Sequence, residues 1–441
     1  MAHHHSAHSG KFRSSAGFIL AAVGSAVGMG NIWLFPYRVG QYGGGAFLIP
    51  YFLFVALFSY VGLSGEFAFG RLTGTGARGS FDYAMKSRGW RGGSVLGILP
   101  LLGVLGIAIG YSVVVGWVLR YAAGSLTGSL LESQPDAYFD QLAVSFGSIP
   151  WHFLVIAATV VILVLGVTAG IEKISKFMMP AFYLFFLVIA LRVAFLPGAV
   201  DGYRYLLEPD WSYLLRFETW VMAMGQAFFS LSINGAGMLI YGSYMKKSEN
   251  IIRQSVMTAI LDTMAALLSG FAILPAVFAF GIAPNSGPSL MFITIPRVFQ
   301  QMPGGQVLSL FFFLSVLFAG ITSLINMLEA VGESLSKGTG LPRKASMAVV
   351  GCVTFGVSVF LESLPAMGAW LDAVTVYIAP FGAVLGAIMI YWVLGLRAIR
   401  AELMEGRTRP LGRAFDFLAK YVYVFLSAAV LVLGIAYGGI G

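Results

Sequence analysis

Long apolar runs recur along the chain from residue 14 to residue 438, and no other feature of the sequence limits the fold as strongly. A helix of about 20 apolar residues crosses the hydrocarbon core of a bilayer, where only helices and closed barrels satisfy their own backbone polar groups. Charged residues make up only 10% of the chain. The sequence therefore predicts an all-α polytopic membrane protein. We expect eleven transmembrane helices, at residues 14–38, 44–70, 93–123, 150–169, 174–196, 217–243, 252–282, 305–336, 343–361, 367–396 and 415–438.

The Lys and Arg residues are distributed unevenly between the expected loops. If the N-terminus is cytoplasmic, 21 of them lie on the inner side and 6 on the outer side. Cytoplasmic loops of membrane proteins are enriched in Lys and Arg, so we expect a multi-pass protein of the cell (inner) membrane with a cytoplasmic N-terminus and an extracytoplasmic C-terminus. Orientation in the membrane accounts for the net charge of +8, and no nucleic-acid partner is expected. Residues 1–10 read as a tag-like leader, which we exclude from the fold prediction.

Two of the expected helices contain a glycine-rich interruption. The stretch GSAVGMGN (residues 24–31) lies in the first helix, and FFSLSINGAG (residues 228–237) lies in the sixth. Because the two stretches are five helices apart, the second half of the chain must enter the membrane from the opposite side. Paired broken helices in inverted halves are typical of the central site of a transporter. We therefore expect a first five-helix repeat at 14–200, a second at 216–397, and an additional helix at 414–438.

Each interruption would expose backbone N–H groups at the start of one half-helix and C=O groups at the end of the other. A helix N-terminus favours an anion such as a carboxylate, and free carbonyls favour a cation. A zwitterion bound together with sodium would suit both ends. The alternative is that these glycines only allow close helix packing.

Several motifs resemble those of the neurotransmitter:sodium symporters. GFILAAVGSAVGMGNIWLFPY and GQAFFSLSINGAGMLIYGSY resemble the first and sixth helices of that family, and GGGAFLIPY and FAGITSLINMLEA match further motifs. The resemblance extends over about residues 14–438. It implies the LeuT-type 5+5 inverted repeat with broken helices 1 and 6, and sodium-driven uptake of amino acids or related amines by alternating access. It also implies two sodium sites and a small zwitterionic amino-acid substrate.

The resemblance assigns oxygen donors to each sodium ion. The first site would use the Ala26 carbonyl, Asn31, Ser230 and Asp262, completed by the substrate carboxylate. The second would use the carbonyls of Gly24, Val27 and Ala319 and the hydroxyls of Thr322 and Ser323. In isolation, the Thr322–Ser323 pair would be weak evidence, because such hydroxyls often bond back to their own helix.

Asp262 lies deep in the seventh expected helix. An intramembrane carboxylate costs about 2.5–3.5 kcal/mol on insertion scales and indicates a functional role. The resemblance implies that chloride-dependent members of the family bind chloride close to this position, where Asp262 would supply a fixed negative charge instead. We therefore expect transport without chloride. A buried, hydrogen-bonded and inert Asp262 is the alternative.

The resemblance also implies how an amino acid would be held. The N–H groups of Met29 and Gly30 and the Tyr111 hydroxyl would bind the carboxylate, while the Ala26 and Phe229 carbonyls and Ser232 would bind the ammonium. Monoamine transporters have Asp where this chain has Gly28, so Gly28 favours an amino acid. The side-chain pocket would include, close to Ser230, the residues Ile107, Phe229, Ile233, Asn234, Gly235, Leu324 and Met327.

Two of these pocket residues bear on the size and polarity of the substrate. Gly235 stands where the family often has a bulkier residue, and with the flexible Met327 it would leave space for a medium to large apolar side chain. Asn234 could bind a polar group of the substrate, or it could bind the backbone freed by the helix break.

Charged residues are missing from the positions where the family closes its gates. Leu34 and Thr375 replace the outer Arg–Asp pair, and Lys337 replaces the inner Asp. We expect the outer gate to rest on Tyr111, Phe229 and apolar packing.

Glu66 and Glu329 are further acidic residues inside the expected helices. Glu66 matches a family Glu that hydrogen-bonds the broken first helix. Glu329 could line the inner pathway, take part in proton antiport, or be a solvated vestibule residue.

Together these features predict a sodium-coupled secondary active symporter of neutral amino acids. A sodium-coupled carrier of GABA, taurine or a betaine-like zwitterion is the alternative within transport, and a ligand-gated channel or sensor is the alternative from another class. No catalytic residues are expected, because the sequence shows no Walker loop, metal-binding cluster or nucleophile–base pair. Membrane lipid is an expected partner, and the sequence leaves monomer and dimer open.

Overall fold

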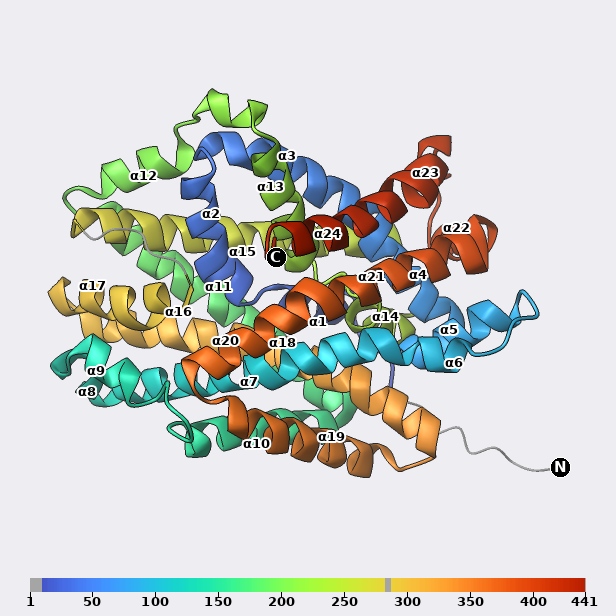
Figure 1. The fold of residues 1–441 in the computed structure, drawn as a ribbon, viewed down its shortest axis with the longest axis horizontal. Coiled ribbons are helices and arrows are strands. Elements are labelled where there is room, and N and C mark those ends of the chain that lie inside the picture. The colour runs from blue at the N-terminus through green and yellow to red at the C-terminus, as the bar shows by residue number, and fades with distance from the viewer. Residues whose placement is uncertain (1–9, 282–286, 441) are drawn as a thin grey trace.

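The computed structural model describes residues 10–281 and 287–440, and this part of the chain is built from helices with no β-strand (Figure 1). Eight helices in it are long and apolar enough to cross a membrane, and a bent pair at Ser15–Gln41 makes a ninth span. The predicted leader lies, apart from Gly10, outside the described residues.

The eight unbroken spans are built from consecutive helical elements. One span comprises α3 (Gly45–Leu57), η2 (Phe58–Leu63) and α4 (Ser64–Thr73), and the next comprises α6 (Gly93–Leu96) and α7 (Ile98–Thr127). A third comprises η3 (Val167–Glu172) and α11 (Lys173–Ala194), and a fourth is α15 (Ile251–Ala279). The fifth of these spans is α18 (Gly305–Thr339), and the sixth comprises α19 (Arg343–Ser358) and η6 (Val359–Leu361). The seventh comprises α20 (Leu364–Ala373), η7 (Val374–Ile378), α21 (Ala379–Ile388), η8 (Met389–Gly395) and α22 (Leu396–Met404). The eighth comprises α23 (Arg413–Phe417), η9 (Leu418–Tyr423) and α24 (Val424–Ala436).

Three predicted spans correspond to shorter or interrupted helices. The first is α1 (Ser15–Ala26), η1 (Gly30–Leu34) and α2 (Phe35–Gln41). The fourth is α10 (Ile149–Val164), and the sixth is α13 (Phe217–Ser230) and α14 (Gly237–Ser243). In the described residues, helical elements lie at all eleven predicted positions, and the first and sixth are interrupted as predicted. Nine of these positions, counting the bent first one, hold helices long and apolar enough to cross a membrane.

Short helices also occur between the spans, where the sequence analysis expected loops. They are α5 (Ala77–Lys86), α8 (Ser129–Glu132), α9 (Pro135–Asp140), α12 (Ala199–Leu207), η4 (Trp211–Leu215), α16 (Gly287–Ser289), η5 (Leu290–Thr294) and α17 (Ile295–Gln301). In α5 the buried residues Ala77, Ser80, Phe81 and Ala84 follow a helical spacing, as in a helix with one apolar face. A search for membrane-spanning runs does not detect such a helix, because its apolar face is short.

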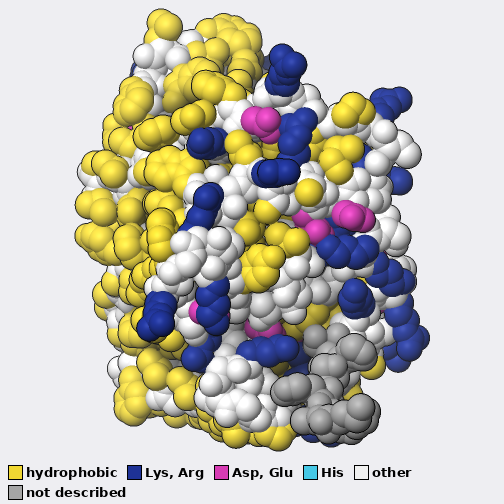
Figure 2. All heavy atoms as spheres, turned by 90° about the vertical axis from the view of Figure 1, so that its right-hand side faces the viewer, with side chains coloured by type: hydrophobic (Ala, Val, Ile, Leu, Met, Phe, Trp, Pro, Cys, Tyr) yellow, Lys and Arg dark blue, Asp and Glu magenta, His cyan; other side chains and the backbone are white. Residues whose placement is uncertain are grey.

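Basic side chains gather at one end of the molecule. Figure 2 shows Lys and Arg side chains concentrated on the end that carries α5, α22 and α23 in Figure 1, beside a broad apolar surface. The buried Arg71 of α4 pairs there with Glu402 of α22 at 2.6 Å. A charged end next to an apolar belt is the surface of a protein that lies in a bilayer.

Candidate functional site

The first helix break is short and sharply bent. The helix α1 ends at Ala26, Val27 has an extended conformation (ψ 120°), and η1 begins at Gly30. The two halves of the span differ in direction by 64°. Side chains bind the freed backbone, because Gly28 N–H donates to Asn31 Oδ1 (3.0 Å) and Met29 N–H donates to the Tyr111 hydroxyl (3.3 Å).

The second break spans residues 231–236, between α13 and α14. Gly235 has a positive φ of 78°, and its N–H donates to Glu66 Oε1 at 2.7 Å. The expectation that Glu66 binds the broken first helix is therefore wrong, because its hydrogen bond goes to the sixth. The reason is packing: at Gly70, one turn after Glu66, a Cβ atom would lie 1.9 Å from the Leu239 carbonyl of α14.

The close approach at Gly70 gives a stability prediction. In a Gly70→Ala variant, α4 and α14 must separate, and overpacking of this kind costs roughly 1–3 kcal/mol. We expect a clear fall in the midpoint of thermal unfolding, measured on the detergent-solubilised protein. Gly356→Ala is the matched control, because Gly356 lies within α19 and a Cβ atom there would meet no neighbour within 4 Å. Equal midpoints for the two variants would contradict the packing argument.

Asn234 binds the freed backbone of the second break. Its Oδ1 accepts from Ala236 N–H (3.1 Å) and Gly237 N–H (2.8 Å), as a capping side chain does at a helix start. Of the two roles considered for Asn234, the structure shows this one.

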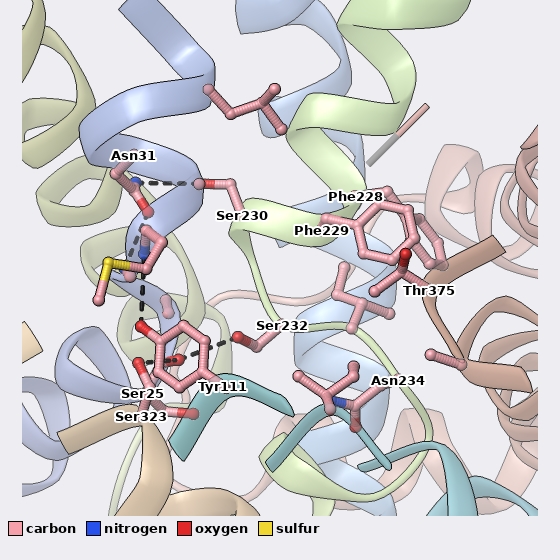
Figure 3. Close-up of a pocket in the computed structure, with 18 of the residues that line it drawn as sticks. Ser25, Asn31, Tyr111, Phe228, Phe229, Ser230, Ser232, Asn234, Ser323 and Thr375 are labelled. Carbon is pink, nitrogen blue, oxygen red and sulfur yellow. Dashed lines mark hydrogen bonds between the residues drawn. The ribbon is translucent and has the colours of Figure 1, made fainter. Parts of the chain in front are cut away.

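A cavity of about 170 Å³ lies between the two breaks (Figure 3). All the predicted substrate residues except Gly235 and Leu324 line it: Ala26, Gly28, Met29, Gly30, Ile107, Tyr111, Phe229, Ser230, Ser232, Ile233, Asn234 and Met327. In Figure 3, Asn31, Tyr111 and Ser323 lie on one side of the cavity and Phe228 and Phe229 on the other. Aromatic rings therefore gather on the second side of the cavity, where Thr375 and Asn234 also lie.

Gly235 and Leu324 do not line this cavity. A Cβ atom at Gly235 would lie 2.7 Å from the Gly382 carbonyl of α21, so this glycine allows the break to pack against α21 and leaves no room for a substrate. Leu324 is fully buried in α18. Its neighbours Ser323 and Met327, four residues apart on one face of the helix, line the cavity instead.

Three polar side chains meet at one end of the cavity. Asn31 Nδ2 donates to Ser230 Oγ (3.1 Å) and to Asp262 Oδ1 (2.9 Å), and Ser230 Oγ donates to Asp262 Oδ2 (2.5 Å). Asp262 is completely buried. The group presents carboxylate and hydroxyl oxygens, which are among the ligands that a hard cation prefers, while the Asn31 amide oxygen accepts from the Gly28 N–H.

A second cluster of oxygen atoms lies where α1 ends. Ser323 Oγ of α18 lies 3.2 Å from the Gly24 carbonyl and 3.0 Å from the Val27 carbonyl. These carbonyls belong to the C-terminal end of a helix, which carries partial negative charge. Thr322 is adjacent, but its hydroxyl donates within α18 to the carbonyls of Phe318 (2.8 Å) and Ala319 (3.1 Å).

The cavity also has lining residues that the sequence analysis did not place there. They are Ser25, Gln226, Phe228, Ala379 and Pro380, together with Leu34 and Thr375 from the expected gate positions and Asn31 and Ser323 from the expected sodium sites. Gln226 could have been found, because it precedes Ser230 by four residues on α13 and so shares its face. Its Nε2 donates to the Gly30 carbonyl at 3.3 Å.

On the other side of the breaks, aromatic and charged side chains are packed in the interior of the described residues. Phe12 is buried and packs edge-on against Phe18 and Tyr241. Glu329 is fully buried, so it is not a solvated vestibule residue, and it pairs with Arg343 of α19 at 2.6 Å. The sequence analysis did not consider Arg343.

Comparisons with known proteins agree with this geometry. The model of the sodium:neurotransmitter symporter family matches residues 9–141 and 139–439. An uncharacterized sodium-dependent transporter of Bacillus subtilis, YhdH, is 34% identical over 96% of each chain. A similar transporter of Methanocaldococcus jannaschii is 30% identical over 97% of this chain and 92% of its own. The crystal structure of MhsT in complex with L-phenylalanine has a TM-score of 0.85 and 29% identity, covering 97% of this chain and 99% of that one.

Proposed function

The chain belongs to the sodium:neurotransmitter symporter family of sodium-dependent transporters, and we propose that it takes up a neutral amino acid with a medium to large apolar side chain. The observation that carries this proposal is the cavity between two helix breaks, with Asn31, Tyr111 and Ser323 on one side and the rings of Phe228 and Phe229 on the other. The protein is a multi-pass membrane protein with the LeuT-type fold and not an enzyme. The inferences that follow concern its ions, substrate and orientation.

The two oxygen clusters are the proposed sodium sites. The first comprises the Ala26 carbonyl, Asn31, Ser230 and Asp262, and the second comprises the carbonyls of Gly24, Val27 and Ala319 with the hydroxyls of Thr322 and Ser323. Unwound carbonyls and the C-terminal ends of half-helices coordinate sodium in transporters of this kind. The second site requires Thr322 to turn its hydroxyl from its own helix toward the ion. Asp262 supplies a fixed charge beside the first site, so transport is proposed to proceed without chloride.

The proposed substrate pose uses both breaks. The carboxylate lies at the Met29 and Gly30 N–H groups and the Tyr111 hydroxyl, and completes the ligands of the first sodium ion. The ammonium lies at the Ala26 and Phe229 carbonyls and Ser232, whose hydroxyl donates to the Ser25 carbonyl at 3.0 Å. Because ion and carboxylate complete one another, each raises the affinity of the other by the same factor.

The apolar lining of the cavity supports the proposed side-chain preference. The apolar residues that line the cavity include Ile107, Phe229, Ile233 and Met327. The structurally similar MhsT was solved with L-phenylalanine, whose side chain fits this class. Gly235 does not support the preference for a medium to large side chain, because it packs against α21 and adds no space to the cavity. A longer zwitterion such as GABA or taurine therefore loses its main structural support.

We also propose the orientation of the protein in the membrane and the positions of its internal repeats. The basic end of the molecule (Figure 2) supports a cytoplasmic N-terminus and an extracytoplasmic C-terminus in the cell membrane. We place the two inverted repeats at 14–200 and 216–397 and the additional helix at 414–438. The oligomeric state, monomer or dimer, has no bearing on this assignment.

Uptake into proteoliposomes tests the proposed function. With an inward sodium gradient, labelled phenylalanine or leucine is expected to accumulate above the external concentration, since two sodium ions can supply about 7 kcal/mol at 100 mV and a tenfold gradient. Replacing sodium with potassium is expected to reduce equilibrium binding at least about tenfold. A panel with GABA, taurine and betaine tests the other substrate class. Equilibration without accumulation would favour a channel or sensor.

A further inference from the structure

Arg38 is a buried cation next to the outer end of the cavity. It follows Leu34 by one turn and is 6% exposed. Its Nη1 donates to the Ile440 carbonyl (2.6 Å), the Met222 carbonyl (3.4 Å) and Gln226 Oε1 (3.5 Å). Among the described residues, no carboxylate pairs with it. Burying a charge is costly unless hydrogen bonds compensate, and these neutral acceptors stabilise the buried guanidinium.

The shortest of these bonds comes from the segment that follows α24. We call residues 438–440 the terminal segment. It turns back on itself, with positive φ at Gly438 (66°) and Gly439 (122°), and Gly439 N–H donates to the Gly434 carbonyl at 2.8 Å. Ile440 is only 1% exposed.

The terminal segment fits directly against the helices around the cavity. At Gly225 of α13, a Cβ atom would lie 1.9 Å from the Ile440 carbonyl. At Gly439, a Cβ atom would lie 3.6 Å from the Val376 side chain of η7, next to Thr375. The segment therefore joins three elements that contribute to the cavity: the outer half of the first span, α13 and η7.

Arg38 also connects to the cavity itself through Gln226. The Gln226 side chain accepts from Arg38 and donates to the Gly30 carbonyl at the first break (3.3 Å). Gln226, Leu34 and Thr375 all line the cavity. A continuous path of hydrogen bonds thus runs from Ile440 through Arg38 and Gln226 to the first helix break.

We propose that the terminal segment and Arg38 form the outer closure of the cavity, in place of the charge pair that is missing at Leu34 and Thr375. When the outer halves of the first and sixth helices separate, the terminal segment cannot keep both the Arg38–Ile440 bond and its contact at Gly225. Displacement of the terminal segment is therefore part of outward opening. The inference rests on the proposed function only in that the cavity is taken to alternate between open and closed states.

Access to a cysteine placed at Thr375 tests this closure. All proteins carry Thr375→Cys together with Cys352→Ser, which removes the one native cysteine. A membrane-impermeant thiol reagent labels the protein in sodium with saturating phenylalanine. We expect the chain that ends at Tyr437 to be labelled at least about fivefold faster than the full chain, the lower range of coupling between linked sites. Gly225→Ala, which displaces the segment without removing it, is expected to act in the same direction.

A protein that combines the truncation after Tyr437 with Gly225→Ala shows whether the two changes act through the same contact or independently. If both act by releasing the terminal segment, the doubly altered protein is labelled no faster than the truncated one, since coupled changes are not additive. Arg204→Gln is the control, because Arg204 is exposed on α12, with 69% of its side-chain area accessible, and its labelling rate is expected to stay at the parental value. The inference is overturned if the truncated chain is labelled within twofold of the rate of the full chain. It is also overturned if the effects of the truncation and of Gly225→Ala on the labelling rate are fully additive.

The same measurement without sodium and phenylalanine distinguishes this inference from the proposed function. If the proposed function is wrong, neither ligand protects the parental protein from labelling. The comparison of full-length and truncated chains in ligand-free buffer then still decides whether the terminal segment closes the cavity.

Discussion

Replacing Asp262 with Asn is expected to abolish sodium-driven uptake in chloride-free medium and to create a requirement for chloride. Asp262 is completely buried and is bound by Asn31 and Ser230. Two unit charges 4 Å apart interact by about 4 kcal/mol at an effective dielectric constant near 20. Loss of that attraction lowers sodium affinity at least about 100-fold, because each 1.4 kcal/mol is a factor of ten. A chloride ion bound near the substituted side chain would restore part of that attraction.

Uptake in gluconate and in chloride media measures both parts of this prediction. The parental protein is expected to transport equally well in the two media. The variant is expected to be inactive in gluconate and partly active in high chloride. Ser230→Ala is the matched control, since it removes one ligand and leaves the carboxylate charge, and is expected to weaken sodium binding without any chloride effect. A variant as active as the parent in gluconate would show that Asp262 is an inert buried carboxylate.

Replacing Gly28 with Asp is expected to weaken amino-acid binding at least about 100-fold relative to Gly28→Asn. A Cβ atom at Gly28 would lie 3.0 Å from the Tyr111 hydroxyl, so the new side chain would lie where the substrate carboxylate is proposed to bind. Repulsion between two carboxylates about 4 Å apart again amounts to about 4 kcal/mol at this effective dielectric constant. The Asn variant has the same shape without the charge, so the difference between the two isolates electrostatics.

Equilibrium binding of labelled phenylalanine in saturating sodium measures this effect. Both variants are expected to bind less well than the parent, because any side chain at position 28 crowds Tyr111. Thermal unfolding of both proteins shows whether each is folded. If the Asp and Asn variants bind equally, the substrate carboxylate lies elsewhere in the cavity.

Much of the fold could be predicted because its strongest signals are local. The length of an apolar run identifies a membrane span, and glycine and hydroxyl residues in the middle of a run identify a break. Helix α5 was missed because its apolar face is too short to resemble a span. Arg343 was missed because its partner Glu329 lies on another helix, and only the turn between α18 and α19 brings them together.

The predictions of the site failed where they depended on the direction of a side chain. Motifs placed most of the substrate residues at the cavity, since residues on a known broken helix share its position. Gly235 was expected to provide space, but the fold turns it toward the Gly382 carbonyl. Glu66 was assigned to the wrong break because sequence cannot show that α4 packs along α14 at Gly70. The contact of Ile440 with Arg38 joins positions 402 residues apart, and no sequence pattern records it.

The unwound link between α1 and η1 determines how the inner half of the first helix can move. Gly28 and Met29 direct their N–H groups to side chains instead of to carbonyls of α1. The helix formed by residues 15–26 can therefore change direction about this link without losing the backbone hydrogen bonds of a helical turn. Contacts at the N-terminal end of this helix oppose such a movement, such as the hydrogen bonds from the Arg13 N–H and the Ser14 hydroxyl to Glu172 at 2.6 and 2.9 Å. A few side chains at the end of the helix remote from the break are thus the contacts that such a movement must disrupt.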